Sequence, residues 1–279
     1  FDALTYRLFN LAGTPAPLTH WVHLRIIDDE QEASDDQSRG DFWGLYLAVE
    51  NIDKAFIKEH GLAAGNLYKI EHRRPLTRHV GVPFIHSPSE AYQFISSLSR
   101  GSQNSQWWQQ NTDLEKYYQY RSVVESVRHY DISEGKNYYF YFDGGQNRWI
   151  TIPWDVDLTW GEHMYGSGKD PFYRAGVFGD RERNIDYQTE MATFQDLLFN
   201  EDEMDRLIDD HASIIDPSSD THSLADADRA MWDYHPIMQS RYSRPRQAGQ
   251  GRFYFGEETA TFEVMVAYLK QFVRKRSKW

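Results

Sequence analysis

The strongest constraint on this chain is the stretch "NYYFYFDGGQNRWITIPW", in which aromatic and β-branched residues stand on both sides of a glycine-containing turn. Two such runs around "DGGQN" predict a β-hairpin. The first run, "YYFYF", is aromatic throughout, which is typical of a buried strand. The rest of the chain must therefore supply elements that cover this hairpin.

The first third of the chain is rich in strand signals. After an amphipathic helix predicted in "DALTYRLFNLAG", the segments "HWVHLRII" and "DFWGLYLAVE" predict an antiparallel pair joined by an exposed acidic loop. A short helix, "IDKAFIKEH", follows, and "LYKIEH" predicts a third strand of the same small sheet.

Helical spacing dominates the remainder. We interpret "RRPLTRHVGVPFIHSP" as a crossing segment, after which "SEAYQFISSL" and the long "TDLEKYYQYRSVVESVRH" predict helices, and further helices follow the hairpin. The sequence thus predicts an α+β protein with a strand-rich region at residues 1–85. A mainly helical region at residues 86–279 contains the hairpin.

Composition excludes several function classes. The net charge of -12 argues against sequence-independent binding to nucleic acid or anionic lipid. No apolar run approaches the roughly 20 residues that span a bilayer. The chain has no cysteine and no H-E-x-x-H pattern, so neither a disulfide nor a zinc site is expected. Because it begins with Phe1, we expect it to be a piece of a longer chain.

Polar residues flank the hairpin in an order that suits phosphoryl transfer. His129, Tyr130 and Asp131 follow the long predicted helix, Asn137 comes six residues after Asp131, and "PWDVD" follows the hairpin. Protein kinases have His-Arg-Asp, an Asn five residues after the Asp, and a metal-binding Asp further on. Here the spacing is one residue longer and no Asp-Phe-Gly is present.

Each of these acids also has a structural interpretation. Asp131 could simply bond backbone groups at a helix end or turn. Asp155 and Asp157 would point the same way if the strand continued, and their like charges would repel. A divalent cation would relieve that repulsion.

Four separated motifs, "GDFWGLYLAVENID", "GNLYK", "KNYYFYFD" and "IPWDVDLTWG", together resemble the spore-coat protein H (CotH) kinase family. The resemblance covers nearly the whole chain. It implies a two-lobed protein-kinase-like fold, with a small β-rich N-lobe at residues 1–85, of which more is expected before Phe1, and a larger helical C-lobe at residues 86–279. It also implies ATP- and Mg²⁺- or Mn²⁺-dependent phosphorylation of Ser or Thr in a protein substrate, commonly outside the cytoplasm.

The resemblance assigns roles position by position. Asp131 matches the catalytic Asp, Asn137 the metal-binding Asn and Asp155 the metal-binding Asp, with Asp157 as a second candidate for that task. The segment "GEHMYGSG" takes the place of an activation segment.

Nucleotide contacts are assigned in the predicted small lobe. Lys69 is the available lysine for the phosphates, and Glu50 is the carboxylate expected to hold it; the alternative is a surface cross-strand pair. The true nucleotide Lys or Arg could precede Phe1, since no Gly-rich phosphate loop is present.

Two other functions stay open. The same fold could serve as a catalytically inactive pseudokinase or binding module of a larger surface or secreted protein. A carbohydrate-active enzyme could use Asp131 and Asp155 as its carboxyl pair among the tryptophans. The sequence does not identify the acceptor, the preferred metal or the oligomeric state.

Overall fold

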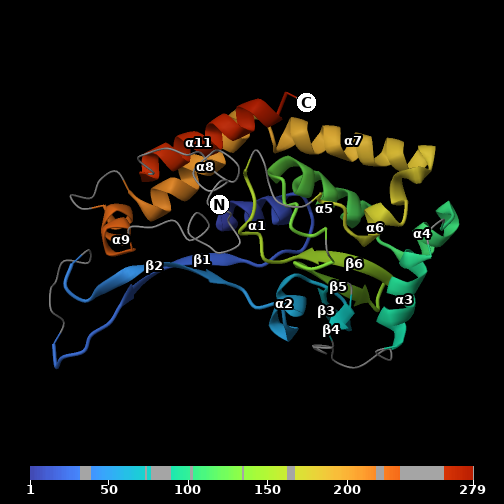
Figure 1. Cartoon of the computed structure of the whole chain (residues 1–279), viewed down its shortest axis with the longest axis horizontal. Helices are drawn as coiled ribbons and strands as arrows, with labels where there is room; N and C mark the ends of the chain where they lie inside the picture. Colours follow the sequence, from blue (N-terminus) through green and yellow to red (C-terminus); the bar gives the residue numbers. More distant parts are fainter. Residues whose placement is uncertain are drawn as a thin grey trace. The chain divides into compact units, whose positions relative to one another are not determined.

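The computed structural model describes residues 1–31, 39–72, 74–76, 89–100, 103–133, 135–161, 167–217, 223–232 and 261–278. The fold is mixed α+β with small antiparallel sheets, as the sequence predicts (Figure 1). The strands are β1 (Thr19–Arg25), β2 (Phe42–Val49), β3 (Gly65–Glu71), β4 (Arg74–Leu76), β5 (Tyr138–Asp143) and β6 (Arg148–Pro153). The helices are α1 (Asp2–Leu11), α2 (Lys54–Glu59), α3 (Ser89–Ser99), α4 (Ser105–Asn111), α5 (Leu114–Val127), α6 (Pro171–Arg174), the 3-10 turn η1 (Val177–Gly179), α7 (Arg181–Leu197), α8 (Glu201–Ile215), α9 (Leu224–Trp232) and α11 (Phe262–Arg276).

The predicted hairpin is confirmed. Strands β5 and β6 pair antiparallel from Tyr138↔Pro153 to Asp143↔Arg148. The Asp143 carboxylate closes the turn by accepting hydrogen bonds from the backbone N–H of Gly145 (2.7 Å) and of Gln146 (3.1 Å). This use of a short acidic side chain is the reason why Asp is favoured at turns.

The third strand was predicted in the wrong sheet. Strand β3 pairs with β5 of the hairpin, and the sheet runs β4-β3-β5-β6, whereas β1 and β2 form a separate two-stranded sheet. Strand β5 is aromatic on both faces, so a partner on its free edge extends the buried surface. Strand β4 lies within the segment that the sequence analysis interpreted as a crossing.

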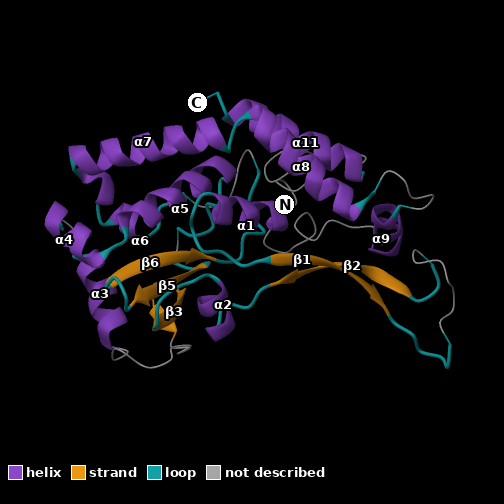
Figure 2. Cartoon of the chain, turned by 180° about the vertical axis from the view of Figure 1, so that it is seen from behind, coloured by secondary structure: helices purple, strands orange, loops and turns teal. Residues whose placement is uncertain are grey.

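Helices cover both faces of the four-stranded sheet. Figure 2 shows α2 on one side and α5 and α6 on the other. On the α2 side, Phe56 belongs to a buried cluster with Tyr139 and Tyr141 of β5. On the other side, the Phe140 ring lies 5.3 Å from the ring of Phe172 in α6 and 5.6 Å from that of Phe94 in α3. Successive side chains of β5 thus pack alternately into the core on the α2 side and into the core on the α6 side.

Two compact units make up the described chain. One comprises Phe1–Leu18, Glu50–Thr159 and Met164–Phe199, and the other comprises Thr19–Val49, Trp160–His163 and Asn200–Trp279. All six predicted site residues belong to the first unit. The predicted lobe boundary after residue 85 and residues 162–166 of the predicted activation segment lie outside the described residues, so both stay predictions.

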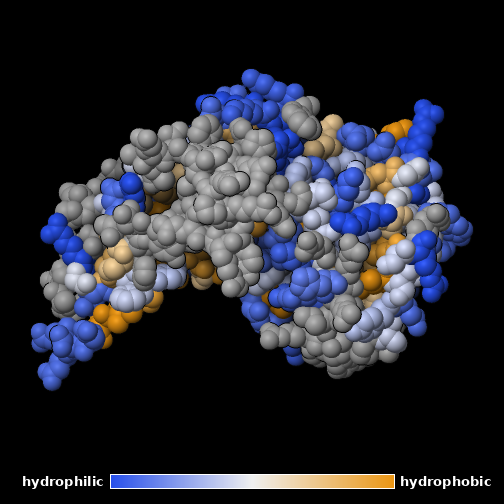
Figure 3. Space-filling model, in the orientation of Figure 1, coloured by the Kyte–Doolittle hydropathy of each residue, from blue (hydrophilic) through white to orange (hydrophobic). Residues whose placement is uncertain are grey.

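The second unit contains the β1–β2 ribbon and the helices α8, α9 and α11. In α11, Arg274 binds Glu201 (2.7 Å) and Asp205 (3.1 Å) of α8. The ribbon exposes large apolar side chains such as Val22 and Trp43, and Figure 3 shows apolar patches along it. Within the described residues, no helix is long and apolar enough to cross a membrane.

A buried ionic network fixes α5 in the first unit. Arg121 is 1% exposed. Its guanidinium donates to the Asp170 carboxylate (3.2 Å) and to the Gly168 carbonyl, and it pairs with Glu125 one turn further along α5. The Tyr117 hydroxyl also donates to Asp170 (2.9 Å). The predicted apolar stripe of α5 therefore includes a buried cation whose two terminal nitrogens have partners.

The same network reaches the start of α6 and the loop after α5. Asp170 caps α6 by accepting from the backbone N–H of Phe172 (2.9 Å) and Tyr173 (3.0 Å). The Tyr130 hydroxyl donates to Glu125 (3.0 Å), and the Gly168 N–H donates to the Tyr130 carbonyl (3.3 Å). The loop that carries Asp131 is thus held from two sides.

Replacing Arg121 with Ala should lower the free energy of unfolding by about 3 to 5 kcal/mol, because it leaves buried carboxylates without their cation. Arg206→Ala is the matched control, since Arg206 pairs with Glu203 on an exposed surface and should lower the free energy of unfolding far less. Urea unfolding of the two variants measures the difference. Equal losses would contradict this description of the network.

Candidate functional site

The register of the hairpin brings Asn137 next to the residues that follow β6. Tyr138 lies opposite Pro153, so the residue before β5 meets the residue after β6. The Trp154 N–H accordingly donates to the Asn137 carbonyl at 3.2 Å. Antiparallel pairing therefore places Asn137 and Asp155 at the same open end of the hairpin.

Asn137 and Asp155 share an uncommon backbone conformation. Their φ angles are 65° and 54°, in the left-handed region that Asn and Asp tolerate better than most residues. Strand β6 ends at Pro153, so the condition under which Asp155 and Asp157 would point the same way, a continuing strand, is not met. Backbone in such sparsely populated regions clusters at functional sites.

Asp131 and Asn137 are in direct contact. Asp131 follows α5, whose C-cap residue Arg128 is itself left-handed (φ 56°). The Asn137 side-chain amide donates to the Asp131 carboxylate and to the Asp131 backbone carbonyl, both at 3.1 Å. The ammonium of Lys136 lies 3.0 Å from the same carboxylate. The structure thus joins two of the predicted residues and adds a cation.

Burial sets the protonation behaviour of Asp131. The residue is 6% exposed, and loss of hydration raises the pKa of its carboxyl. Lys136 and Asn137 act in the opposite direction, and the negative charge of Asp155 raises the pKa further. Asp131 and Asp155 therefore lie within electrostatic range of each other. They do not lie on opposite surfaces.

Asp155 and Asp157 form an acidic cluster with the first helix. Both are exposed, yet loss of hydration is the largest effect on each: it raises the pKa of Asp155 and brings the pKa of Asp157 to about 7. The charge of Asp155 and that of Asp2 in α1 contribute to the change at Asp157. The Tyr6 hydroxyl of α1 is hydrogen-bonded to the Asp155 backbone. Helix α1 thus forms one wall of the site.

Lys69 and Glu50 are not brought together. Lys69 Nζ lies 2.8 Å from the carboxylate of Glu71, two residues along β3. Glu50 accepts a hydrogen bond from the Leu18 N–H (2.9 Å) and is hydrogen-bonded to His60 (3.0 Å). The expected Lys69–Glu50 pair is therefore wrong. Lys69 nevertheless acts on Asp155, because its charge lowers the pKa of that carboxyl.

Lys136 and Asp2 are the site residues that the sequence analysis missed. Lys136 stands next to Asn137 in the loop "SEGKN", and this position beside the candidate amide ligand was a signal that could have been used. Asp2 gave no such signal, because a first-turn Asp has the ordinary purpose of stabilising a helix N-terminus.

The donors at this end of the hairpin fit a hard divalent cation. Carboxylate and amide oxygens are the ligands that Mg²⁺ and Mn²⁺ take in proteins. In the part of the chain that the structure describes, no group of three His, Cys, Asp or Glu residues is arranged to hold a metal by itself. A cation held by Asp155 or Asp157 would thus also use the Asn137 amide or oxygens of a bound phosphate.

Comparison with known families supports the resemblance found in the sequence. The family model described as "CotH kinase protein" matches residues 2–279. A search of the curated proteins found no match.

His129 should make stability depend on pH. It is fully buried, and burial lowers the pKa of its imidazole from 6.5 to about 4. The unfolded chain therefore binds the proton more tightly. The resulting stability, about 3 kcal/mol, is complete above pH 6.5 and is lost as the pH falls toward 4.

The test is urea unfolding of the wild type and of His129→Leu at pH 4.5 and pH 7. The stability of the variant should depend less on pH, because the titrating group is gone. His20→Leu, at an exposed position, should keep the wild-type dependence. Parallel profiles for the wild type and His129→Leu would refute the assignment.

Proposed function

Because the chain belongs to the CotH kinase protein family, we propose that it transfers the γ-phosphoryl group of ATP to a hydroxyl of Ser or Thr in a protein substrate. The family suggests a phosphotransferase and a kinase-like fold. The choice of acceptor and the dependence on Mg²⁺ or Mn²⁺ are our proposals. Residues 1–85 and 86–279 would form the two lobes.

One observation carries the proposal: Asn137 donates a hydrogen bond to the Asp131 carboxylate, and the negative charge of Asp155 raises the pKa of Asp131. These residues are 24 positions apart at most in the sequence, and each matches a kinase role. An ordinary capped turn would show the hydrogen bond alone. Here each residue also has the chemical type and the chain position that a kinase role requires.

Asp131 is the proposed acceptor of the proton of the attacking hydroxyl. A general base works best when its pKa lies near the working pH, and burial moves the pKa of Asp131 upward. Asn137 and Lys136 both contact the Oδ2 of Asp131, and we assign the other carboxylate oxygen, Oδ1, to the acceptor hydroxyl. The Lys136 ammonium also offers positive charge to a phosphoryl group in transfer.

Asn137, Asp155 and Asp157 are the proposed metal ligands. A bound divalent cation would neutralise charge on the phosphates. Without a cation, the carboxylates of Asp155 and Asp157 repel, which is one cause of the raised pKa of Asp157. The residues present therefore fit the group that the family implies.

Lys69 is the proposed phosphate contact in β3. Its charge already acts on Asp155, and its partner Glu71 holds the ammonium in place. Glu71 thus fills the position that the sequence analysis gave to Glu50. A direct role of Glu50 in nucleotide binding stays a prediction.

A binding module without catalysis is the second candidate. The ion pair of Lys136 with Asp131 favours it, because a base that is engaged by a cation is less available to a hydroxyl. The kinase and the binding module would have the same fold, and only the kinase would transfer phosphate.

Asp131→Asn should lower the rate of phosphoryl transfer by about 10² to 10⁴-fold, because the neutral amide cannot accept the proton. The measurement is incorporation of labelled phosphate from ATP with Mn²⁺ into a mixture of candidate proteins. Asp210→Asn, on the exposed face of α8, is the matched control. Label incorporation by Asp131→Asn at the wild-type rate would rule out the role of Asp131.

Asp155→Asn should remove the stabilisation that ATP and Mn²⁺ give to the wild type. Ligand at 100 times its dissociation constant stabilises by about 2.7 kcal/mol, which thermal unfolding detects readily. Asp157→Asn tested in parallel ranks the two carboxylates by the size of the loss. An unchanged shift in both variants would mean that the cation binds elsewhere.

A further inference from the structure

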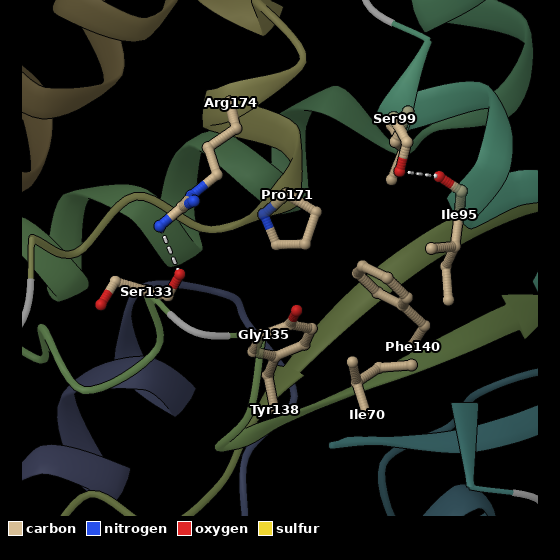
Figure 4. A pocket seen from close by; sticks show the side chains of 10 residues that line it. Ile70, Ile95, Ser99, Ser133, Gly135, Tyr138, Phe140, Pro171 and Arg174 are labelled. Carbon is tan, nitrogen blue, oxygen red and sulfur yellow. Dashed lines mark hydrogen bonds between the residues drawn. The ribbon is translucent and has the colours of Figure 1, made fainter. Parts of the chain in front are cut away.

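A mainly apolar cavity of about 240 Å³ that opens to solvent lies on the face of the sheet opposite Lys69. Figure 4 shows Ile70 and Phe140 of the strands across from Ile95 of α3, with Tyr138 and Pro171 nearby. Tyr138 and Phe140 alternate along β5 with Tyr139, which pairs with Lys69 and belongs to the cluster around α2. The sheet thus separates this cavity from the proposed phosphate contact.

The cavity reaches the catalytic loop. Ser133 and Gly135 line it, and they stand between Asp131 and Lys136 in the sequence. A group that entered the cavity would therefore lie beside the loop that holds the proposed base.

The size of the cavity limits its occupant. Pockets for drug-sized ligands usually measure about 300 to 1,000 Å³. A space of about 240 Å³ is small for a nucleotide but suitable for one large aliphatic side chain. Its walls are mainly apolar, which favours that kind of group over a sugar or a phosphate.

The rim adds positive charge in a protein that is acidic as a whole. Arg174 lines the cavity and is exposed, and its guanidinium donates to the carbonyl of Lys169 (2.8 Å) and to that of Ser133. Lys169 does not line the cavity, but it is exposed beside Arg174, and its ammonium lies 5.3 Å from the centroid of the Tyr173 ring. Among the described residues, neither side chain is ion-paired with a carboxylate. Both are therefore available to an anionic group outside the cavity.

We propose that this cavity is the specificity pocket for the acceptor polypeptide, taking a large aliphatic side chain near the phosphorylated hydroxyl while Arg174 and Lys169 bind an acidic residue of the same segment. The proposal rests on the proposed kinase function and names its substrate class. It assigns recognition to the face of the hairpin that the nucleotide does not use.

The experiment uses peptides with one Ser, in which Leu is moved through the positions on either side and all other residues are held constant. Direct binding is followed by fluorescence anisotropy without ATP, and transfer is followed as kcat/KM with ATP and Mn²⁺. Burying one aliphatic side chain should favour Leu over Ala about tenfold or more at one position. A second set, with Asp moved around the fixed Leu, tests the rim.

Two variants close the cavity. Ile95→Trp fills it from within, and Ser99→Trp fills it from an exposed position of α3 where the change should cost little stability. Both should abolish the preference for Leu while leaving the Ala peptide unaffected. Tyr92→Trp, at an exposed position of the same helix that does not line the cavity, is the matched control. Arg174→Glu and Lys169→Glu should replace the preference for Asp with one for Lys.

Three results would overturn the proposal. All peptides bind equally, no peptide binds, or the preference for Leu survives in both Ser99→Trp and Ile95→Trp. Phosphoryl transfer that proceeds without any preference would refute the pocket and leave the kinase standing. A Leu preference in binding without transfer would support the pocket and refute the kinase.

Discussion

The pairing register of one hairpin determines where the chemistry of this protein lies. Because Tyr138 faces Pro153, the residues before β5 and after β6 must meet: Trp154 donates to the Asn137 carbonyl, and Asp155 is the next residue. The hairpin can hold them firmly because its first strand is buried on both faces. The packed aromatic side chains of β5 therefore fix the backbone that carries the polar site. The hydrogen bonds within the site depend on that rigid backbone.

Two opposing effects set the pKa values of the aspartates at the site: loss of hydration and the charges of nearby lysines. Loss of hydration raises the pKa of Asp131, Asp155 and Asp157, whereas Lys136 and Lys69 offset part of that effect. A cluster in which carboxylates outnumber the cations favours any additional positive charge. This excess of negative charge suits metal-assisted phosphoryl transfer. It arises from the position of helix α1, which carries Asp2, as much as from the hairpin.

The sequence predicted the hairpin, the long helix before it and the main helices after it, because each has a clear period or turn signal. Its error was the sheet that contains β3: alternation shows that a segment is a strand but not which strand it joins. The proximity of Asp131 and Asn137 could be predicted from their short separation in the chain. The pairing of Lys69 with Glu71 could not be predicted, because several carboxylates were in principle within reach of that lysine. The position of α1 against Asp155 is a long-range contact that no local pattern encodes.

Paramagnetic relaxation by Mn²⁺ in the presence of ATP tests the central claim most directly, using protein labelled with ¹⁵N. If the ends of the hairpin converge on one cation, the amide signals of Asp131, Asn137 and Asp155 should broaden together at the lowest Mn²⁺ concentration. Broadening that begins instead at the acidic helix α8, with these three signals unaffected, would contradict the account.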